Sequence, residues 1–557
     1  MENAVKVELG SSFNLNAGIC GLLTFLQANN ADEGIDYEIE DQCIYIGIDY
    51  LKNNSIPEMY VKTMANVLGE NTKCYRILND RYIDNTYKKG IENLSDKDVD
   101  ALKKKYTEFV TKFVSKSYLS AYKLLEQEDD IQPITEKMIV DLKKCNDLQL
   151  KYQKYQNLVR LLNQQKVKDT LIYTELVYTQ FKLFFAENAY KKIDCLCKSG
   201  QNYEQRYKDN FFSPLLEELK IEEKKKSCSC IECRNSAKHK KAFTFLSDTA
   251  DDVTRKKSYY WLCKPDAFVC PTCAFVYSFI PLGFAFMGND AVFINNNNSV
   301  KELQKIMATC KAKADGENES VRRRVLRTLT SEKINALNNV MSNVQVIMNS
   351  SDFSHFKFEV IDKDIVAKLQ KGRKYLSNFE NKWVSFDDKN IVSVYDNVLD
   401  YIYEKRDLYY LLDKLLRVEI KKDRSVNYLK GLLRLAVIFN GGAEMNNLNE
   451  KVNSAFIEGS NLRKSILGAD ADKSESEDDN RLRGFVYRLL NLSSVGDREQ
   501  FIDTVSRRYV GFSLPIPKIL KDCYISDEMF KAIAHGFILG LKYVPYKQDN
   551  KEDVNNG

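Results

Sequence analysis

Apolar side chains recur along much of the chain at three- and four-residue spacings, which is the pattern of a helix that buries one face. One such stripe runs over Val99–Phe113, a second over Met138–Leu162 and a third over Leu408–Leu416. The pattern predicts that each stripe is a helix-packing face. Further helices are predicted near the end of the chain, at Leu448–Leu467, Arg481–Asn491, Arg498–Tyr509 and Asp527–Leu541.

An alternating pattern occurs near the start of the chain. The isoleucines within Ile44–Ile48 occupy every second position, as one face of a half-buried strand would. The run Asn295–Asn298 is typical of a turn or loop, and a Gly-Gly step at Gly441 interrupts the helical pattern. Nine prolines and 23 glycines in 557 residues favour long regular elements between such breaks.

Residues 267–289 carry no charged side chain, and 23 such residues are long enough to cross a bilayer. The same stretch contains Cys270-Pro-Thr-Cys273, Pro281 and Gly283, which would interrupt a lone spanning helix. The first residues of the chain also lack the basic and apolar regions of a secretory signal. We therefore expect a cytoplasmic protein with no membrane segment, whose 14 cysteines are reduced thiols or metal ligands.

Two CxxC pairs carry the clearest chemistry in the chain. They are Cys230-Ile-Glu-Cys233 and Cys270-Pro-Thr-Cys273, separated by residues 234–269. Two residues between cysteines let both thiolates of a tight turn face one cation, and two such turns complete the tetrahedral sulfur shell that zinc prefers. Because four thiolates leave no open position for water, we expect a structural zinc site held by Cys230, Cys233, Cys270 and Cys273.

The cysteines also allow interpretations other than this zinc site. Buried cysteines can act as small hydrophobic side chains, and Cys228 and Cys263 are spare thiols that could replace an assigned ligand. The signature of a zinc deaminase is absent, because Val269 replaces its proline and no His-x-Glu is present. The chain also lacks a phosphate loop, an H-E-x-x-H motif and a nucleophile elbow, and it has only three histidines. We therefore predict no catalytic residues.

These patterns together predict an α-rich α+β protein with several domains, as a length of 557 residues allows. A mixed N-terminal domain with long helices precedes a zinc-ribbon-like insertion with the CxxC pairs. A helical middle region and a C-terminal helical bundle follow. The predicted boundaries are 1–220 for the N-terminal domain, 221–300 for the insertion, 301–440 for the middle region and 441–557 for the bundle.

The net charge of the whole chain is only +5, so the positions of the charges matter more than their total. Residues 224–264 hold eleven Lys and Arg against four Asp and Glu, with aromatic residues among them; residues 481–521 hold eight against three. A third cluster, Arg322–Arg327, lies on a predicted helix. Nucleic-acid binding needs phosphate contacts and stacking faces, although each cluster alone could be a solvated surface. The predicted nucleic-acid contacts are Lys238, Lys240, Lys241, Lys256, Lys257, Arg322, Arg323, Arg327, Arg507 and Arg508.

Several segments, taken in order along the chain, resemble one known family. They are Asn16-Ala-Gly-Ile-Cys-Gly21, the two CxxC pairs, Tyr487–Asn491, Phe501–Tyr509 and Gly536–Leu541. With them the chain resembles the CXXC–CXXC family of CRISPR-associated proteins, which are large subunits of type I-B Cascade effector complexes. The resemblance implies a non-catalytic subunit of an RNA-guided antiviral defence complex.

The resemblance also implies partners and roles. Such a subunit binds target DNA, recognises a short flanking motif (PAM) and helps recruit a separate helicase-nuclease, while guide RNA reads the target. It assembles with backbone subunits and a small subunit, which the C-terminal bundle resembles. An internal start at Met445, or at Met341 or Met348, would produce that small subunit.

The glycines of Asn16–Gly21 could approach DNA closely, but we interpret this segment as a buried turn before a helix over Leu22–Gln27.

Two other classes of function stay open at this point. The first is a stand-alone nucleic-acid-processing enzyme whose zinc knuckles position the substrate and whose catalytic carboxylates match no known motif. The second is a zinc-stabilised scaffold that binds only proteins, with basic clusters that are merely solvated. Metal-dependent cleavage by the isolated chain would favour the enzyme, and a native complex without nucleic acid would favour the scaffold.

Overall fold

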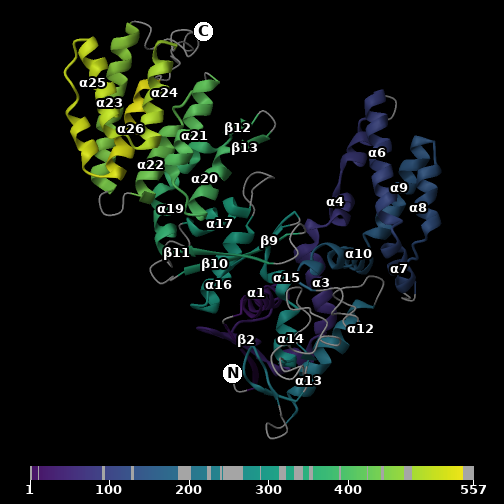
Figure 1. Ribbon diagram of the computed structural model, residues 1–557. Helices are drawn as coiled ribbons and strands as arrows, with labels where there is room; N and C mark the ends of the chain where they lie inside the picture. The colour runs from purple at the N-terminus through teal and green to yellow at the C-terminus, as the bar shows by residue number, and fades with distance from the viewer. Residues whose placement is uncertain are drawn as a thin grey trace, which may run out of the picture. The chain divides into compact units, whose positions relative to one another are not determined.

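The chain folds into two compact units (Figure 1). Unit 1 comprises Met1–Val321 and Lys333–Val360, and unit 2 comprises Arg322–Glu332 and Ile361–Gly557. Helices dominate and the sheets are small, so the predicted α-rich α+β class is confirmed; the four domain boundaries stay a prediction. This computed structural model describes residues 3–10, 12–90, 94–126, 131–185, 202–221, 228–238, 241–242, 268–288, 290–312, 321–331, 343–350, 356–387, 390–422, 425–440, 445–468 and 480–543.

Unit 1 consists of helices with short strands between them. Its first sheet has the order β1 (Ala4–Glu8), β3 (Cys43–Gly47) and β2 (Tyr37–Glu40). The helices are α1 (Phe13–Ala28), α2 (Ile48–Asn53), α3 (Ile56–Leu68), α4 (Lys73–Asn79), α5 (Tyr82–Lys88), α6 (Asp96–Phe113), α7 (Lys116–Leu125), α8 (Glu136–Lys144), α9 (Leu148–Leu162), α10 (Gln165–Thr179), α12 (Tyr203–Tyr207), α13 (Ser213–Glu218), α14 (Pro271–Tyr277), α15 (Ile280–Gly283) and α16 (Val300–Lys311). The later strands are β4 (Cys228–Ser229), β5 (Ser236–Ala237), β6 (Lys241–Ala242), β7 (Phe268–Val269), β8 (Ala285–Met287), β9 (Asp290–Asn295), β10 (Asn343–Ser350) and β11 (Lys357–Asp362).

The periodic patterns of the first half are largely confirmed. Ile44 and Ile46 are buried in β3, as their alternation predicts, whereas Ile48 is half-buried and begins α2. The first apolar stripe forms α6, in which the buried stripe residues are Leu102, Tyr106, Phe109 and Phe113. The second stripe divides into α8 and α9, because the Asp147 carboxylate caps a new helix by accepting a hydrogen bond from the Leu150 N–H at 2.7 Å.

Helix α1 corrects the prediction for Asn16–Gly21. The sequence pattern predicts a turn there and a helix only from Leu22, but the helix begins at Phe13 and includes the whole segment. Glycine weakens an isolated helix by about 1 kcal/mol relative to alanine. Here tertiary packing outweighs that cost, since residues 15–23 are all buried.

The two glycines of α1 face the backbone of other helices. A Cβ atom built on Gly18 would lie 2.6 Å from the carbonyl oxygen of Val276, and one built on Gly21 would lie 1.9 Å from that of Phe279. Both distances are shorter than a Cβ atom tolerates, so glycine is needed at both positions. Helices α14 and α15 therefore pack backbone to backbone against α1.

A buried asparagine fixes the chain just before α1. The Asn16 side chain accepts a hydrogen bond from the Gly10 N–H at 2.9 Å and donates to the side-chain oxygens of Asn295 at 2.9 Å and Asn297 at 2.8 Å. The run Asn295–Asn298 ends β9 and leads into α16, which confirms its prediction as a connection. These bonds satisfy the buried amide and hold two distant segments together.

The charge-free residues 267–289 do not form one long helix. They are divided between β7, α14, α15 and β8, with Pro271 and Pro281 in the first turns of the two helices. Strand β8 then joins a four-stranded sheet of order β11-β10-β9-β8. Over the described ranges, no helix combines the length and the apolar character needed to cross a bilayer.

The described residues of unit 2 form mainly helices, together with one hairpin and the last two residues of β11. Every leucine of the third stripe is buried in α21, and the four predicted C-terminal helices are present as α23 to α26, so both predictions are confirmed (Figure 1). The elements are α17 (Val321–Leu329), α19 (Lys363–Leu376), β12 (Trp383–Asp387), β13 (Asn390–Ser393), α20 (Val394–Tyr403), α21 (Leu408–Lys421), α22 (Leu429–Asn440), α23 (Met445–Leu467), α24 (Asn480–Val495), α25 (Arg498–Gly511), the 3₁₀ helix η9 (Lys518–Tyr524) and α26 (Asp527–Lys542).

Helices α23 and α26 pack closely through glycines on both sides. A Cβ atom on Gly459 would lie 2.1 Å from the Phe537 carbonyl oxygen, and one on Gly540 would lie 2.1 Å from that of Phe456. Each glycine thus accommodates the backbone of the facing helix. This reciprocal contact fixes α23 as a rigid element of the bundle.

Candidate metal centre

The first CxxC pair lies in the loop of a small β-hairpin. Strands β4 and β5 pair with Ser229 opposite Ser236. The Cys230 N–H donates to the Asn235 carbonyl oxygen at 3.0 Å, and the Arg234 N–H donates to the Cys230 carbonyl oxygen at 2.9 Å. Arg234 adopts the left-handed backbone conformation, with φ 60°, which closes the loop. The tight turn places both cysteines of the pair on the same side.

The second CxxC pair lies at the start of α14. Cys270 is the N-cap residue, and its sulfur accepts a hydrogen bond from the Cys273 N–H at 3.4 Å. Pro271 occupies the first turn of the helix. Proline has no backbone N–H, and this costs nothing here because N–H groups of the first turn have no acceptor within the helix. The Cys270 N–H in turn donates to the Cys230 sulfur at 3.3 Å. Backbone hydrogen bonds therefore hold the sulfur atoms of the two pairs next to each other.

The four sulfur atoms lie within 4.8 Å of one another. Those of Cys233 and Cys270 are 3.7 Å apart. A tetrahedron with metal–sulfur distances of about 2.3 Å has edges of about 3.8 Å, so this separation fits a shared ion. Cys230 and Cys273 are only 2% and 1% exposed. The four cysteines could therefore hold a metal ion in a closed shell made entirely of sulfur.

Because the four thiols lie close together, the pKa values of some are lowered and those of others are raised. Hydrogen bonding with Cys233 lowers the pKa of Cys230, whereas hydrogen bonding with Cys230 raises the pKa of Cys273. One thiolate is stabilised by neighbouring S–H donors, but a second negative charge in the same buried site is repelled by the first. A divalent cation would remove that repulsion, because thiolates are the form of cysteine that binds metal.

Glu232 lies inside the first CxxC pair, in the loop between β4 and β5. Burial raises the pKa of its carboxyl group, and hydrogen bonding with Tyr277 and Ser12 opposes this shift. Tyr277 ends α14 and Ser12 is the N-cap residue of α1. Glu232 therefore lies close to the same two helices that meet at Gly18. Sequence reasoning missed Glu232 because its partners lie far away along the chain.

The structure brings together the four cysteines that the sequence predicts as ligands. Strands β6 and β7 form a second short ladder beside Cys270, with Lys241 opposite Val269. The spare thiol Cys263 lies outside the described residues, and Cys228 lies in β4. The predicted structural role agrees with the closed sulfur shell.

Two of the five predicted lysine contacts lie in the described residues, near the CxxC pairs. Lys238 follows β5 and has an exposed side chain, and Lys241 lies in β6. Lys240, Lys256 and Lys257 lie outside the described residues. Nucleic-acid binding by these lysines stays a prediction.

The arginine cluster of α17 is engaged within unit 2. The Arg323 guanidinium donates to both carboxylate oxygens of Asp396, at 3.0 and 3.2 Å, and to the Ser393 hydroxyl at 2.9 Å. Arg322 forms an ion pair with Asp400, also on α20. Planar two-point pairing of this kind orients the guanidinium firmly. These contacts give both arginines a structural role, and phosphate binding by them, or by the half-buried Arg327, stays a prediction.

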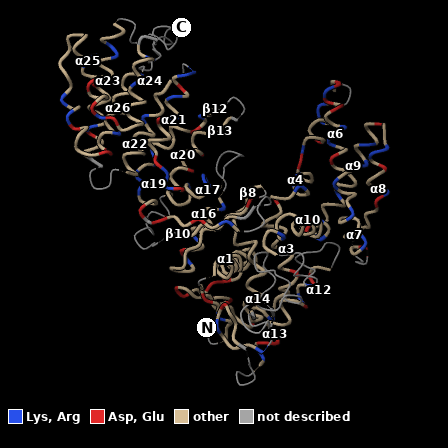
Figure 2. The backbone as a smooth tube through the Cα atoms, in the orientation of Figure 1, with Lys and Arg blue, Asp and Glu red and all other residues tan. Residues whose placement is uncertain are grey.

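Arg507 and Arg508 are exposed on α25, and Figure 2 shows where basic and acidic positions fall along the backbone. Arg507 pairs with Asp503 one turn earlier at 2.9 Å, with side chains 80% and 52% exposed. Such an exposed pair contributes about 0–1 kcal/mol, so a phosphate can replace it. The Arg508 guanidinium lies 5.1 Å from the centre of the Phe485 ring. Contact of either arginine with nucleic acid stays a prediction.

A match with a known protein family falls on the candidate metal centre. No curated protein and no solved structure matches the chain. Residues 223–285 match the family model described as CRISPR-associated protein (Cas_CXXC_CXXC), and this segment contains all four clustered cysteines. Over this segment the chain is therefore similar to CRISPR-associated proteins of that family, and the clustered cysteines lie where the similarity is found.

Proposed function

We propose that the chain is the non-catalytic large subunit of an RNA-guided type I-B CRISPR interference complex. In this role it binds target DNA, recognises the flanking motif and helps recruit a separate helicase-nuclease. The observation that carries the proposal is the closed cluster of four cysteines inside the segment that matches the CRISPR-associated family. A shell of four sulfurs leaves no coordination position for a substrate, which supports a structural rather than a catalytic metal.

The proposed metal is zinc. Zn²⁺ prefers four tetrahedral ligands and binds cysteine thiolates, which are the only donors in this cluster. Bound zinc would supply no reaction chemistry here. Its effect would be to join the hairpin loop of the first pair to the N-terminus of α14.

The partners in this proposal are guide RNA, backbone subunits and a small subunit. The first test is a native pulldown through a tag on the full chain, expressed together with its neighbouring genes. The expected result is a uniform short RNA together with several copies of a backbone subunit. The measurements are sequencing of the bound RNA and mass spectrometry of the bound proteins.

Two outcomes of the pulldown would contradict the proposal in different ways. Partner proteins without any nucleic acid would show a zinc-stabilised scaffold. A chain that carries metal but neither RNA nor partners would point to a stand-alone enzyme. In that case, cleavage of nucleic acid by the isolated chain, lost on a single carboxylate substitution, would establish the enzyme.

The exposed arginines of α25 provide a second test of DNA binding. Replacing both Arg507 and Arg508 by alanine should weaken binding to duplex DNA and reduce the salt slope by roughly 2, because each phosphate contact releases about 0.9 counterion. The measurement is the dissociation constant at several salt concentrations. The fold should be unaffected, since both side chains are exposed.

A matched control is the double variant Arg81→Ala/Arg160→Ala. These two arginines are also exposed but lie in unit 1, outside the predicted basic clusters. Their replacement removes the same charge and should leave the salt slope unchanged. An unchanged slope for the Arg507/Arg508 variant would assign those residues no phosphate contact.

A further inference from the structure

Helix α26 buries a histidine against α21. The His535 side chain is 3% exposed, and the centre of its ring lies 5.5 Å from the centre of the Tyr409 ring. Its Nδ1 atom lies 2.8 Å from the Lys531 carbonyl oxygen, one turn earlier in α26. Because a carbonyl oxygen only accepts hydrogen bonds, Nδ1 carries the proton and Nε2 holds a free lone pair. Among the described residues, no group bonds to this buried Nε2 atom.

The facing side of α21 is also polar and incompletely bonded. Tyr409 and Asp413 lie one turn apart and so share one face of the helix. The Tyr409 hydroxyl and the Asp413 Oδ1 atom are buried without a hydrogen-bond partner in the described part of the chain. The other oxygen of Asp413 accepts a hydrogen bond from the Arg417 guanidinium at 2.8 Å. Unbonded polar atoms are therefore buried on both helices, which most folds avoid.

His535 is held in its neutral form by its surroundings. Burial lowers the pKa of the ring, because a charged imidazolium is poorly solvated inside the bundle. The hydrogen bond to the Lys531 carbonyl and the charges of Asp413 and Asp407 oppose this shift, and the Lys531 ammonium adds to it. Lys531 also pairs with Asp407 at 2.9 Å, which joins the two helices at their surface.

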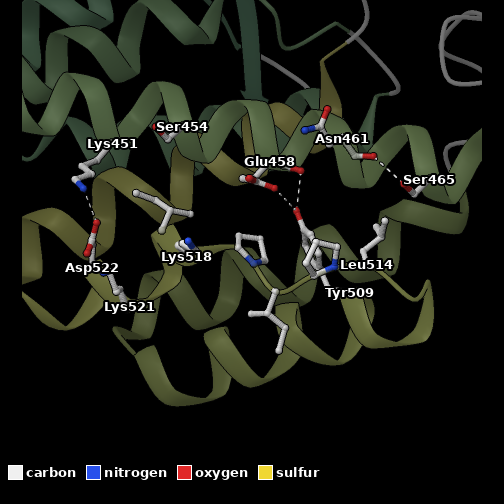
Figure 3. A pocket seen from close by; sticks show the side chains of 14 residues that line it. Lys451, Ser454, Glu458, Asn461, Ser465, Tyr509, Leu514, Lys518, Lys521 and Asp522 are labelled. Carbon is white, nitrogen blue, oxygen red and sulfur yellow. Dashed lines mark hydrogen bonds and ion pairs between the residues drawn. The ribbon is translucent and has the colours of Figure 1, made fainter.

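The other elements packed against α26 hold their charges in separate contacts. Three guanidinium groups of α22, α23 and α24 donate to oxygens of Asn449, Leu541 and Lys421; they belong to Arg434, Arg463 and Arg483. On η9, Asp522 pairs with Lys451 of α23 at 2.7 Å, and the exposed Lys518 and Lys521 line a groove beside that pair (Figure 3). These contacts do not include His535, so its ring depends on α21 for a counter-charge.

A proton taken up at Nε2 would charge a ring that has no hydrogen-bonded carboxylate. Burying such a charge is costly, so the protonated ring favours a state in which α26 moves away from α21 and water reaches the ring. We propose that His535 makes the contact between α21 and α26 a pH-sensitive switch, which holds α26 in place near neutral pH and releases it in acid. The switch needs no nucleic acid and no partner, so it can be tested independently of the proposed function.

The direction of the pH dependence follows from the two states of the ring. An exposed histidine has a pKa of about 6.5, so the open state takes up a proton below that pH while the buried ring stays neutral. The stability contributed by the neutral ring is fully present above about pH 6.5 and falls as the pH decreases. Between about pH 7.5 and 5.5, the population of the open state should rise as much as about tenfold.

Glu528, in the first turn of α26, has the opposite effect. Burial raises the pKa of its carboxyl group, so its contribution to stability increases as the pH falls. The effect of His535 must therefore be measured as a difference between the wild type and a variant that lacks the ring. His535→Asn serves this purpose, because its amide can still donate to the Lys531 carbonyl but takes up no proton.

The first test is hydrogen–deuterium exchange of peptides from Asp527–Lys542 in the full chain with its metal. After correction for intrinsic exchange rates, protection in the wild type should fall as much as about tenfold further than in His535→Asn between about pH 7.5 and 5.5. The matched control is His355→Asn, which removes a histidine outside the described residues and should keep the wild-type dependence. Equal pH dependence in the wild type and His535→Asn would overturn the proposal.

A second measurement does not require the His535 variant to fold. The chain has three histidines, so a sample labelled with carbon-13 in histidine gives few ring signals by NMR. His239→Asn and His355→Asn assign the signal of His535 by elimination. The expected result is a neutral His535 ring for as long as α26 stays protected from exchange. A ring that becomes charged while α26 keeps its full protection would overturn the switch.

Discussion

Replacing Cys273 by serine is expected to abolish metal binding and to unfold the segment around the CxxC pairs. Cys273 is 1% exposed and its sulfur belongs to the closed cluster, so the other three cysteines would have to hold the ion without it. Structural zinc contributes on the order of 10 kcal/mol to the folding of zinc-finger peptides. We expect a comparable local effect, because a metal bound by the four cysteines would join the short β4–β5 hairpin to the start of α14.

The measurements are metal content per chain and limited proteolysis within residues 223–285. The expected result is a chain with no bound metal that is cut rapidly in this segment. The matched control is Cys145→Ser, which changes a half-buried cysteine between α8 and α9, outside the cluster. It should keep full metal content. If Cys273→Ser also keeps its metal, Cys273 is not an essential ligand, and the spare thiols Cys228 and Cys263 become the candidates to replace it.

Replacing Gly21 by alanine is expected to destabilise unit 1 by about 3 kcal/mol or more. The added Cβ atom would lie 1.9 Å from the Phe279 carbonyl oxygen, so α1 and α15 would have to move apart. A backbone contact cannot relax by rotating a side chain, which makes this clash more costly than ordinary overpacking. The measurement is the free energy of unfolding by denaturant.

Gly484→Ala is the matched control for this prediction. Gly484 also lies within a helix, α24, but a Cβ atom there would meet no other atom within 4 Å. Alanine should leave stability unchanged or raise it by about 1 kcal/mol, because it favours the helical backbone. If Gly21→Ala is as stable as the wild type, the close approach of α1 and α15 is wrong.

The metal centre illustrates how much a sequence can specify on its own. A CxxC pair is a local feature, because two residues between cysteines place both sulfurs on one turn whatever the rest of the fold does. The sequence therefore predicts all four clustered cysteines, and the structure adds the backbone bonds that bring the pairs together. The helical stripes are predictable for the same reason, since periodicity records which face of a helix is buried.

Contacts between distant residues were beyond the reach of sequence patterns. Asn16–Gly21 resembles a turn because local propensity disfavours glycine in helices, and only the carbonyls of Val276 and Phe279 reveal why glycine is needed there. Likewise, the sequence predicts that Arg322 and Arg323 bind phosphate. In the structure they pair with carboxylates of α20, which lies more than 70 residues later in the chain.

The sequence by itself thus determined the helices with a clear apolar stripe, the early strand and the four clustered cysteines, because each depends on residues that are neighbours along the chain. Tertiary structure alone decided which charges are available and where the backbone is closely packed. Arg323 is paired through Asp396, while Lys518 and Lys521 line an open groove. The physical reason is that the environment of a charge depends on its neighbours in space, which no local pattern of residues records.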